Sequence, residues 1–272
     1  MSIRKPRKFC KLRTDKHWSV DGLVGCWLMN EGAGDKVYDL SGNRYNGDFV
    51  NETAWTVGKH GTALILDGSD DYVNIGDVLK ITTTPLSIVA WVNTTAYANG
   101  SNYTIVSKGE TGGNRAYWLR LYGTGSNCRI RFGDTEGYIY DSSGIGALTP
   151  NQWYQVSGVF GGGSDYRVYR NGYQVIVSGT PSGGFDDSSE PLCIGAEFND
   201  SVLGYPFEGK ISHVYIFNRA LSATEIKQLY LEPFCMFWHD LIELWSKEGA
   251  AAAGDPGIMT LNTGYWGPTY NG

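Results

Sequence analysis

Apolar and polar residues alternate along most of the chain with a period of two, the pattern of β-strands that bury one face. Residues 86–93, LSIVAWVN, carry apolar side chains on both faces, which predicts a central strand covered on both sides. Asn171-Gly172 predicts a tight turn, because both residues tolerate positive φ. Further strands are expected over residues 22–30, 116–122, 129–132, 153–160, 166–170, 190–195 and 209–217.

Residues 63–77, ALILDGSDDYVNIGD, contain two alternating runs around a polar turn. We expect the two runs to pair as a β-hairpin, since Asp, Gly and Ser favour tight turns. The three acids of the turn, Asp67, Asp70 and Asp71, are interpreted as turn residues that face solvent rather than as metal ligands.

One helix is expected to interrupt the strands. Ser222 and Glu225 have the spacing of a capping box, and Pro233 ends the helix that they begin. The chain is therefore predicted to have three sections: a basic N-terminal arm (residues 1–19), an all-β domain (residues 20–232) and a C-terminal extension (residues 233–272). The fold class predicted for the domain is a two-sheet antiparallel β-sandwich.

Charge is distributed unevenly along the chain. The formal net charge is −6, yet residues 1–16 carry seven cations and one acid. Within this arm, Arg4, Lys5, Arg7 and Lys8 are expected to contact nucleic acid or an acidic neighbouring subunit, or else to belong to a solvated, flexible leader. The domain has no basic patch interleaved with aromatic residues, so nucleic-acid binding is not expected.

The extension carries an apolar stripe at helical spacing. A surface must cover these side chains, either the protein's own domain or a partner subunit in a homo-oligomer. The residues assigned to assembly are Phe237, Trp238, Leu241, Ile242 and Trp245.

Two features bear on location and redox state. No secretory leader is visible and no apolar run is long enough to cross a bilayer, so we expect synthesis in a cytoplasm and no membrane partner. The five cysteines are odd in number and widely spaced, which favours reduced thiols.

Several segments together resemble the laminin-G-like, concanavalin A-like lectin/glucanase jelly-roll family. They are GLVGCWLMNEGAGDKVYDLSGNRYNG, ALILDGSDDYVNIGD, PLSIVAWVN, the strand from Trp153 with the Asn171-Gly172 turn, and FEGKISHVYIFNRALSATEIKQLY. The resemblance implies two stacked antiparallel sheets in a jelly roll and a non-catalytic role in binding glycans or proteins. Similar domains occur in secreted bacterial enzymes, cell-surface proteins and phage structural proteins.

The resemblance also implies a calcium ion, the only cofactor that the sequence suggests. The turn from Asp39 to Asn43, DLSGN, resembles a family loop whose oxygen atoms suit a hard cation. Related domains complete the site with acids after Gly-Lys-Ile, where this chain has Ser212 and His213. The alternative is a polar turn in which Asp39 and Asn43 bond the backbone.

Two neighbouring strands carry a candidate binding face. The core is expected under Leu119, Leu121, Ile130 and Phe132. The opposite surface then carries Trp118, Arg120, Tyr122, Arg129 and Arg131. Aromatic rings stack on sugar faces, and guanidinium groups bond hydroxyls or carboxylates. The alternative is an ordinary sheet face whose arginines pair with its acids. Candidates for a rim are Tyr97, Tyr103, Tyr138 and Tyr140.

No catalytic arrangement is evident in the sequence. The glucanases of this fold use a Glu-x-Asp-x-Glu run, which this chain lacks, so we expect a protein that is not an enzyme. The main hypothesis is a structural or display component of a virion, such as a bacteriophage decoration or tail protein, whose arms mediate assembly with other subunits. The alternative is a stand-alone carbohydrate-binding module or adhesin. A glycan-cleaving enzyme is the least favoured hypothesis.

Overall fold

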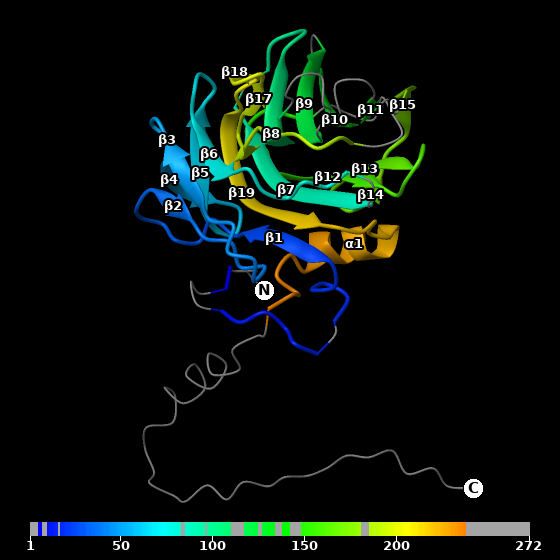
Figure 1. Cartoon of the computed structure of the whole chain (residues 1–272). Coiled ribbons are helices and arrows are strands. Elements are labelled where there is room, and N and C mark those ends of the chain that lie inside the picture. The colour runs from blue at the N-terminus through cyan, green and yellow to red at the C-terminus, as the bar shows by residue number, and fades with distance from the viewer. Residues whose placement is uncertain are drawn as a thin grey trace, which may run out of the picture. The chain divides into compact units, whose positions relative to one another are not determined.

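The structure, a computed structural model, describes residues 5–6, 10–15, 17–82, 85–95, 97–109, 117–124, 127–133, 138–141, 148–180 and 185–237. Contacts divide the chain into two units, Met1–Trp238 and His239–Gly272, and all described residues belong to the first. Two large antiparallel sheets form this unit, and Figure 1 shows them as stacked layers. The predicted antiparallel jelly-roll sandwich is therefore confirmed.

One sheet has eight strands, with β7 at its centre. In spatial order they are β14 (Tyr173–Gln174), β13 (Tyr166–Arg170), β12 (Tyr154–Phe160), β7 (Leu86–Thr94), β19 (Glu208–Phe217), β5 (Gly61–Asp67) and β4 (Ala54–Gly58), and β1 (Leu23–Trp27) also pairs with β19. Every residue of β7 is buried, which confirms a central strand covered on both faces.

The other sheet has nine strands. In spatial order they are β15 (Val177–Thr180), β11 (Tyr138–Asp141), β10 (Asn127–Gly133), β9 (Trp118–Thr124), β8 (Asn102–Lys108), β16 (Leu192–Ile194), β6 (Tyr72–Gly76), β3 (Gly47–Val50) and β2 (Lys36–Val37). A separate two-stranded ribbon consists of β17 (Glu197–Asn199) and β18 (Val202–Gly204). The predicted pairing of β9 with β10 is confirmed.

The main hydrophobic core fills the space between the sheets. The residues of β9 and β10 that were predicted to face it are all fully buried there: Leu119, Leu121, Ile130 and Phe132. In β19 the register shifts between Ile211 and Val214, and this bulge lets both residues reach the core. The opposite face of β9 and β10 is therefore turned away from the other sheet, as the alternation predicts.

The prediction of a β-hairpin over residues 63–77 is wrong. β5 pairs with β4 and β19 in the eight-stranded sheet, whereas β6 pairs with β3 and β16 in the nine-stranded sheet. The turn at residues 67–71 therefore crosses between the layers. Alternation marks which face of a strand is buried but does not identify its neighbour, and only roughly two-thirds of consecutive strands pair with each other.

This crossing buries Asp71, which was expected to face solvent. The residue is 2% exposed, and its Oδ2 accepts a hydrogen bond from the Asp67 N–H at 3.1 Å. Burial raises the pKa of the Asp71 carboxyl. Asp67 and Asp70 are exposed, in agreement with the prediction.

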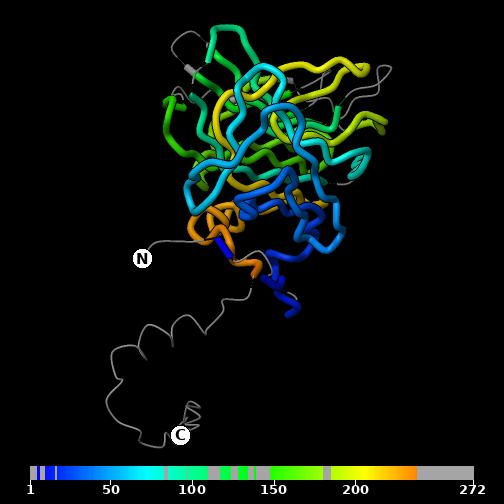
Figure 2. The backbone as a smooth tube through the Cα atoms, turned by 90° about the vertical axis from the view of Figure 1, so that its left-hand side faces the viewer, coloured from blue at the N-terminus to red at the C-terminus, as the bar shows by residue number. Residues whose placement is uncertain are grey.

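The outer face of the eight-stranded sheet carries a second hydrophobic cluster under α1 (Ala223–Leu231) and under segments from both ends of the described chain. Leu12 forms an isolated β-bridge with Phe237. Figure 2 shows the blue N-terminal segment and the orange segment after α1 side by side. Residues 233–237, expected to begin a separate extension, thus pack on the domain itself.

Two local predictions are confirmed. Ser222 Oγ accepts a hydrogen bond from the Glu225 N–H at 3.3 Å, and Glu225 Oε2 accepts one from the Ser222 N–H at 2.7 Å, which completes the capping box. Asn171 and Gly172 join β13 to β14 with φ values of +51° and +77°.

All five cysteines are free, and no described helix has the length and apolarity needed to span a bilayer.

Candidate functional site

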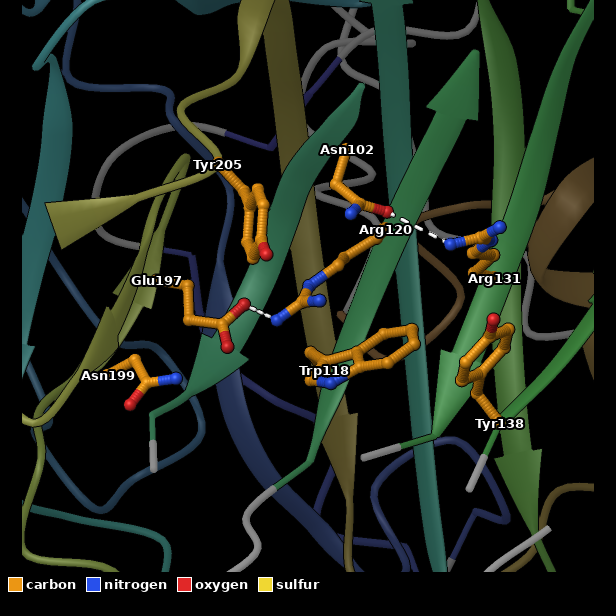
Figure 3. Close-up of a pocket in the computed structure, with 8 residues that line it drawn as sticks. All are labelled: Asn102, Trp118, Arg120, Arg131, Tyr138, Glu197, Asn199 and Tyr205. Atoms are coloured by element: carbon orange, nitrogen blue, oxygen red, sulfur yellow. Dashed lines mark hydrogen bonds and ion pairs between the residues drawn. The ribbon is translucent and has the colours of Figure 1, made fainter. Parts of the chain in front are cut away.

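A hollow of about 190 Å³ lies on the outer face of the nine-stranded sheet (Figure 3). Strands β8, β9, β10 and β11 supply one part of its lining, and the β17–β18 ribbon with the residue after it supplies the rest. The residues that line it are Asn102, Trp118, Arg120, Arg131, Tyr138, Glu197, Asn199 and Tyr205.

Arg120 lies between two aromatic rings of this hollow. Its guanidinium carbon is 4.1 Å from the centre of the Trp118 ring and 4.7 Å from the centre of the Tyr205 ring. The same guanidinium forms an ion pair with Glu197, and both side chains are almost fully buried. Stacking on both faces together with an ion pair fixes the orientation of Arg120.

Arg131 has a similar aromatic environment on the next strand. Its guanidinium carbon is 3.3 Å from the centre of the Tyr122 ring and 4.8 Å from that of Tyr138. Its Nη1 donates to the side-chain oxygen of Asn102 at 3.3 Å. The rings of Trp118 and Tyr138 lie 5.7 Å apart, so the two arginine–aromatic stacks adjoin on this face.

The β17–β18 ribbon is anchored beside the sheet by its own contacts. Glu190 is 7% exposed, and its Oε1 accepts hydrogen bonds from the Ser201 N–H at 2.7 Å and from Ser201 Oγ at 3.3 Å. A Cβ at Gly109 would meet the Phe198 carbonyl oxygen at 2.2 Å, so only glycine permits this close approach of backbones. These contacts hold Glu197 against Arg120.

Tyr205 is exposed to solvent and has an unusual backbone conformation. Its φ is +50°, in the left-handed region that non-glycine residues rarely adopt. Its carbonyl oxygen accepts a hydrogen bond from the Thr104 N–H of β8 at 2.9 Å, and the residue is 47% exposed. The ring is therefore held at the rim of the hollow with much of its surface open to solvent.

Three of the five predicted face residues, Trp118, Arg120 and Arg131, line the hollow. Tyr122 stacks on Arg131, and Arg129 lies on the same face outside the lining. Trp118 and Arg120 are buried rather than open. Tyr205 and Glu197 contact Arg120, whereas Trp118 packs against Arg120 and Tyr138. Of the proposed rim tyrosines, Tyr138 lines the hollow, whereas Tyr103 is buried in the core; the side chain of Tyr140 lies outside the described part of the chain.

The sequence did not point to Asn102, Glu197, Asn199 or Tyr205. No strand was predicted over residues 197–199 or 202–204, because three-residue strands are too short to show alternation. A signal is present in hindsight: the polar Asn199-Asp200-Ser201 between Glu197 and Val202 is typical of a tight turn.

The turn at Asp39 does not fit a calcium ion. Asp39 Oδ1 accepts hydrogen bonds from the N–H groups of Cys26 (2.9 Å) and Ser41 (2.8 Å). Its Oδ2 accepts from Ser41 Oγ at 2.8 Å and from the Tyr45 N–H at 3.0 Å. Asn43 donates its side-chain N–H to the Val24 carbonyl at 3.0 Å. Donors already occupy the carboxylate, so the geometry favours the alternative of a turn that bonds its own backbone.

The two assembly residues that the structure describes are held by their own chain. Lys5 donates its backbone N–H to the His60 carbonyl at 3.0 Å, and its ammonium donates to carbonyls of the domain. Phe237 is 2% exposed. Their contact with a partner stays a prediction. The other assembly residues lie outside the described residues: Arg4, Arg7, Lys8, Trp238, Leu241, Ile242 and Trp245.

The family of the chain follows from its sequence as well as its fold. The Laminin_G_3 family model, described as the concanavalin A-like lectin/glucanases superfamily, matches residues 67–227. This is more than half of the chain, and the chain belongs to this superfamily. A comparison with curated proteins found no match.

Solved structures with the same fold include several binding domains. The binding domain of Paraclostridial Mosquitocidal Protein 1 is 17% identical with a TM-score of 0.61, over 79% of this chain and 53% of that one. Domain 4 of AbnA, a GH43 extracellular arabinanase from Geobacillus stearothermophilus solved with arabinotriose, is 19% identical with a TM-score of 0.59, over 76% and 98%. The receptor binding domain of botulinum neurotoxin D is 17% identical with a TM-score of 0.56, over 79% and 54%.

The chain thus spans about half the length of the toxin binding domains that it matches. A Trypanosoma rangeli sialidase mutant that displays trans-sialidase activity is also similar, at 18% identity and a TM-score of 0.55, but only 33% of that chain is covered. At these identities the likeness establishes a shared fold, and the fold occurs in binding domains and in glycosidases alike.

Proposed function

We propose that this chain is a carbohydrate-binding module and that the hollow beside Arg120 and Arg131 is its binding site. The observation that carries the proposal is the aromatic rim with its fixed polar groups on the outer face of a lectin-like sheet. The phenols of Tyr138 and Tyr205 offer ring surface and polar edges together, a combination that suits a sugar. The buried indole of Trp118 supports this face by stacking on Arg120.

The polar groups of the hollow support the same proposal. The side-chain amides of Asn102 and Asn199 both donate and accept hydrogen bonds, which matches the hydroxyls of a sugar ring. The ion pair and stacking that hold Arg120 are already present without a ligand, so little ordering is needed on binding.

The left-handed backbone of Tyr205 adds to this support. A non-glycine residue in this conformation costs roughly 1–3 kcal/mol and persists only where the surrounding structure imposes it, often at ligand-binding sites. Here it places an exposed ring directly over Arg120, at the rim of the hollow.

The similar structures are in keeping with a binding role. The toxin domains are described as binding domains, and the arabinanase domain was solved with arabinotriose. These proteins support the alternative of a carbohydrate-binding module better than the main hypothesis of a virion component. The virion role and the partner contacts of the terminal arms stay predictions.

We propose binding without catalysis. Most enzymes that cleave glycosidic bonds use two carboxyl groups on either side of the bond. Glu197 is the only acid among the described residues that line the hollow, and Arg120 already pairs with it. An ion-paired carboxylate is a poor general acid, since the adjacent cation favours its charged form.

A glycan array tests the proposal directly. The purified chain is applied to an array that includes arabino-oligosaccharides, galacto-oligosaccharides and their acidic counterparts, and bound protein is measured. Retention on a defined set of glycans, lost on addition of the same free glycan, is expected. Failure to retain the folded protein on any glycan would contradict the proposal.

A further inference from the structure

Arg120 and Arg131 lie directly opposite each other on neighbouring strands. The register of β9 and β10 makes them cross-strand partners, and both side chains line the hollow (Figure 3). Like charges in such a pair repel each other and destabilise the sheet unless each charge is compensated. The question is therefore which acids compensate these two cations.

Of these two arginines, only Arg120 forms an ion pair with an acid among the described residues. Glu197 pairs with it, and the two side chains are 6% and 3% exposed. Trp118 and Tyr205 cover the two faces of the guanidinium. The charges of this ion pair cancel within the hollow.

Arg131 is different. Among the described residues no carboxylate lies within ion-pairing distance of it, and its side-chain contacts are the rings of Tyr122 and Tyr138 and the neutral amide of Asn102. Its buried Nε has no hydrogen-bond acceptor in the part of the chain described. The described lining of the hollow therefore holds one positive charge in excess, on a planar group whose orientation is fixed by stacking.

We infer that the ligand of this hollow is an acidic sugar whose carboxylate binds the Arg131 guanidinium. The inference rests on the proposed carbohydrate-binding function and narrows it to one chemical class. A carboxylate is planar and accepts two parallel N–H bonds from a guanidinium, so it supplies both the missing charge and the missing acceptor.

The size of the hollow limits what reaches Arg131. About 190 Å³ is below the ~300 Å³ at which typical small-molecule pockets begin, so it accommodates a single sugar unit rather than an oligosaccharide. The acidic unit is then expected to enter the hollow, with Tyr205 at the rim beside the next unit of the chain.

Three probes share a lactose core and differ in the group that it carries, so they test whether binding depends on an acidic group. Lactose, 3′-sialyllactose and 3′-sulfolactose carry no acid, a carboxylate and a sulfate respectively. Trigalacturonic acid and its methyl ester form a second pair with the same sugar units, in which esterification removes the negative charges. Binding of each probe to the intact chain is measured by titration calorimetry at low and at physiological salt, because a contact between charges weakens as salt rises.

Arg131→Gln removes the charge and keeps an amide donor. Arg129→Gln, on the same strand and face but outside the lining, is the matched control. We expect at least one carboxylate probe to bind more tightly than its neutral counterpart, and Arg131→Gln to weaken it about ten- to a hundredfold. Arg129→Gln should leave the affinity within about twofold of the unmodified chain. Unfolding temperatures of both variants confirm that each remains folded.

Other outcomes overturn the inference in distinguishable ways. Equal binding of the neutral and acidic members of each pair, unaffected by Arg131→Gln, would leave the proposed function standing and refute the acidic ligand. Binding of 3′-sulfolactose alone would refute the carboxylate. If no carbohydrate binds, on the array or in solution, the proposed function fails together with the inference.

Discussion

Lys5 and Ser212, 207 residues apart in the sequence, are joined by a hydrogen bond of 2.7 Å from the Lys5 ammonium to the Ser212 carbonyl. The same ammonium donates to the carbonyl of Met29 at 3.2 Å and to that of Thr62. Three N–H groups thus meet three carbonyl oxygens. This arrangement ties the N-terminal segment to the eight-stranded sheet and explains why a residue of the basic arm lies within the domain.

Replacing Lys5 by methionine tests the importance of this contact. Methionine has a similar length but no donor, so three carbonyls lose a partner. We expect the free energy of unfolding to fall by about 1–3 kcal/mol in urea titrations. Lys59→Met, at an exposed lysine of the adjacent turn, is the control and should change it by less than about 0.5 kcal/mol. Equal stability of the two variants would mean that the ammonium contributes nothing to folding.

Acid is expected to destabilise the domain through His60. The residue is 8% exposed, and its ring centre lies 4.9 Å from that of Trp91 and 5.7 Å from that of His213. Burial, with the charges of Lys59 and Lys5, lowers the pKa of His60 to about 4. Between pH 6.5 and 4 the unfolded chain therefore binds more protons than the folded one, and the free energy of unfolding falls as the pH falls.

The contribution of His60 is isolated by comparing the chain with His60→Gln. The difference in unfolding free energy between the two proteins should change by about 2–3 kcal/mol from pH 7 to pH 4. His17→Gln, at a less buried histidine, provides the control. A pH dependence that is identical in all three proteins would be incompatible with a neutral, buried His60.

The Asp39 turn is expected to be independent of calcium. Because both carboxylate oxygens accept hydrogen bonds from the chain, Asp39→Asn places an N–H group against a backbone donor and should lower the unfolding free energy by about 1–3 kcal/mol. Asp48→Asn, at an exposed acid paired with Lys36, serves as the control. Unfolding temperatures of the unmodified chain should agree in calcium and in a chelator. A fall of several degrees in the chelator would restore the calcium prediction.

The sequence predicts which strand faces are buried more reliably than it predicts which strands pair with each other. Alternation correctly identifies the buried faces of β7, β9 and β10, because burial of one face imposes a period of two on each strand. It does not reveal that residues 67–71 cross between sheets, since a turn of Asp, Gly and Ser suits a hairpin and a crossing equally. Asp71 was misplaced for the same reason.

The binding face shows a similar limit. Trp118, Arg120 and Arg131 could be placed on one surface from their spacing along two strands. Their partners Glu197 and Tyr205 could not, because they come from a ribbon about 80 residues further along, and only tertiary packing brings it beside β9. Tertiary contact also decides that Arg120 is paired with an acid, which the sequence left open.

Two exposed tyrosines offer the sharpest test of the hollow as a carbohydrate-binding site. Tyr205 is 47% exposed and Tyr173 is 65% exposed, and each stacks with a cation, Arg120 at 4.7 Å and Lys227 at 3.4 Å. Only Tyr205 lines the hollow. The affinity of the glycan retained best on the array is measured for the unmodified chain, Tyr205→Ala and Tyr173→Ala. We predict a loss of about tenfold or more for Tyr205→Ala and unchanged affinity for Tyr173→Ala. Unchanged affinity for Tyr205→Ala, or an equal loss in both variants, would contradict it.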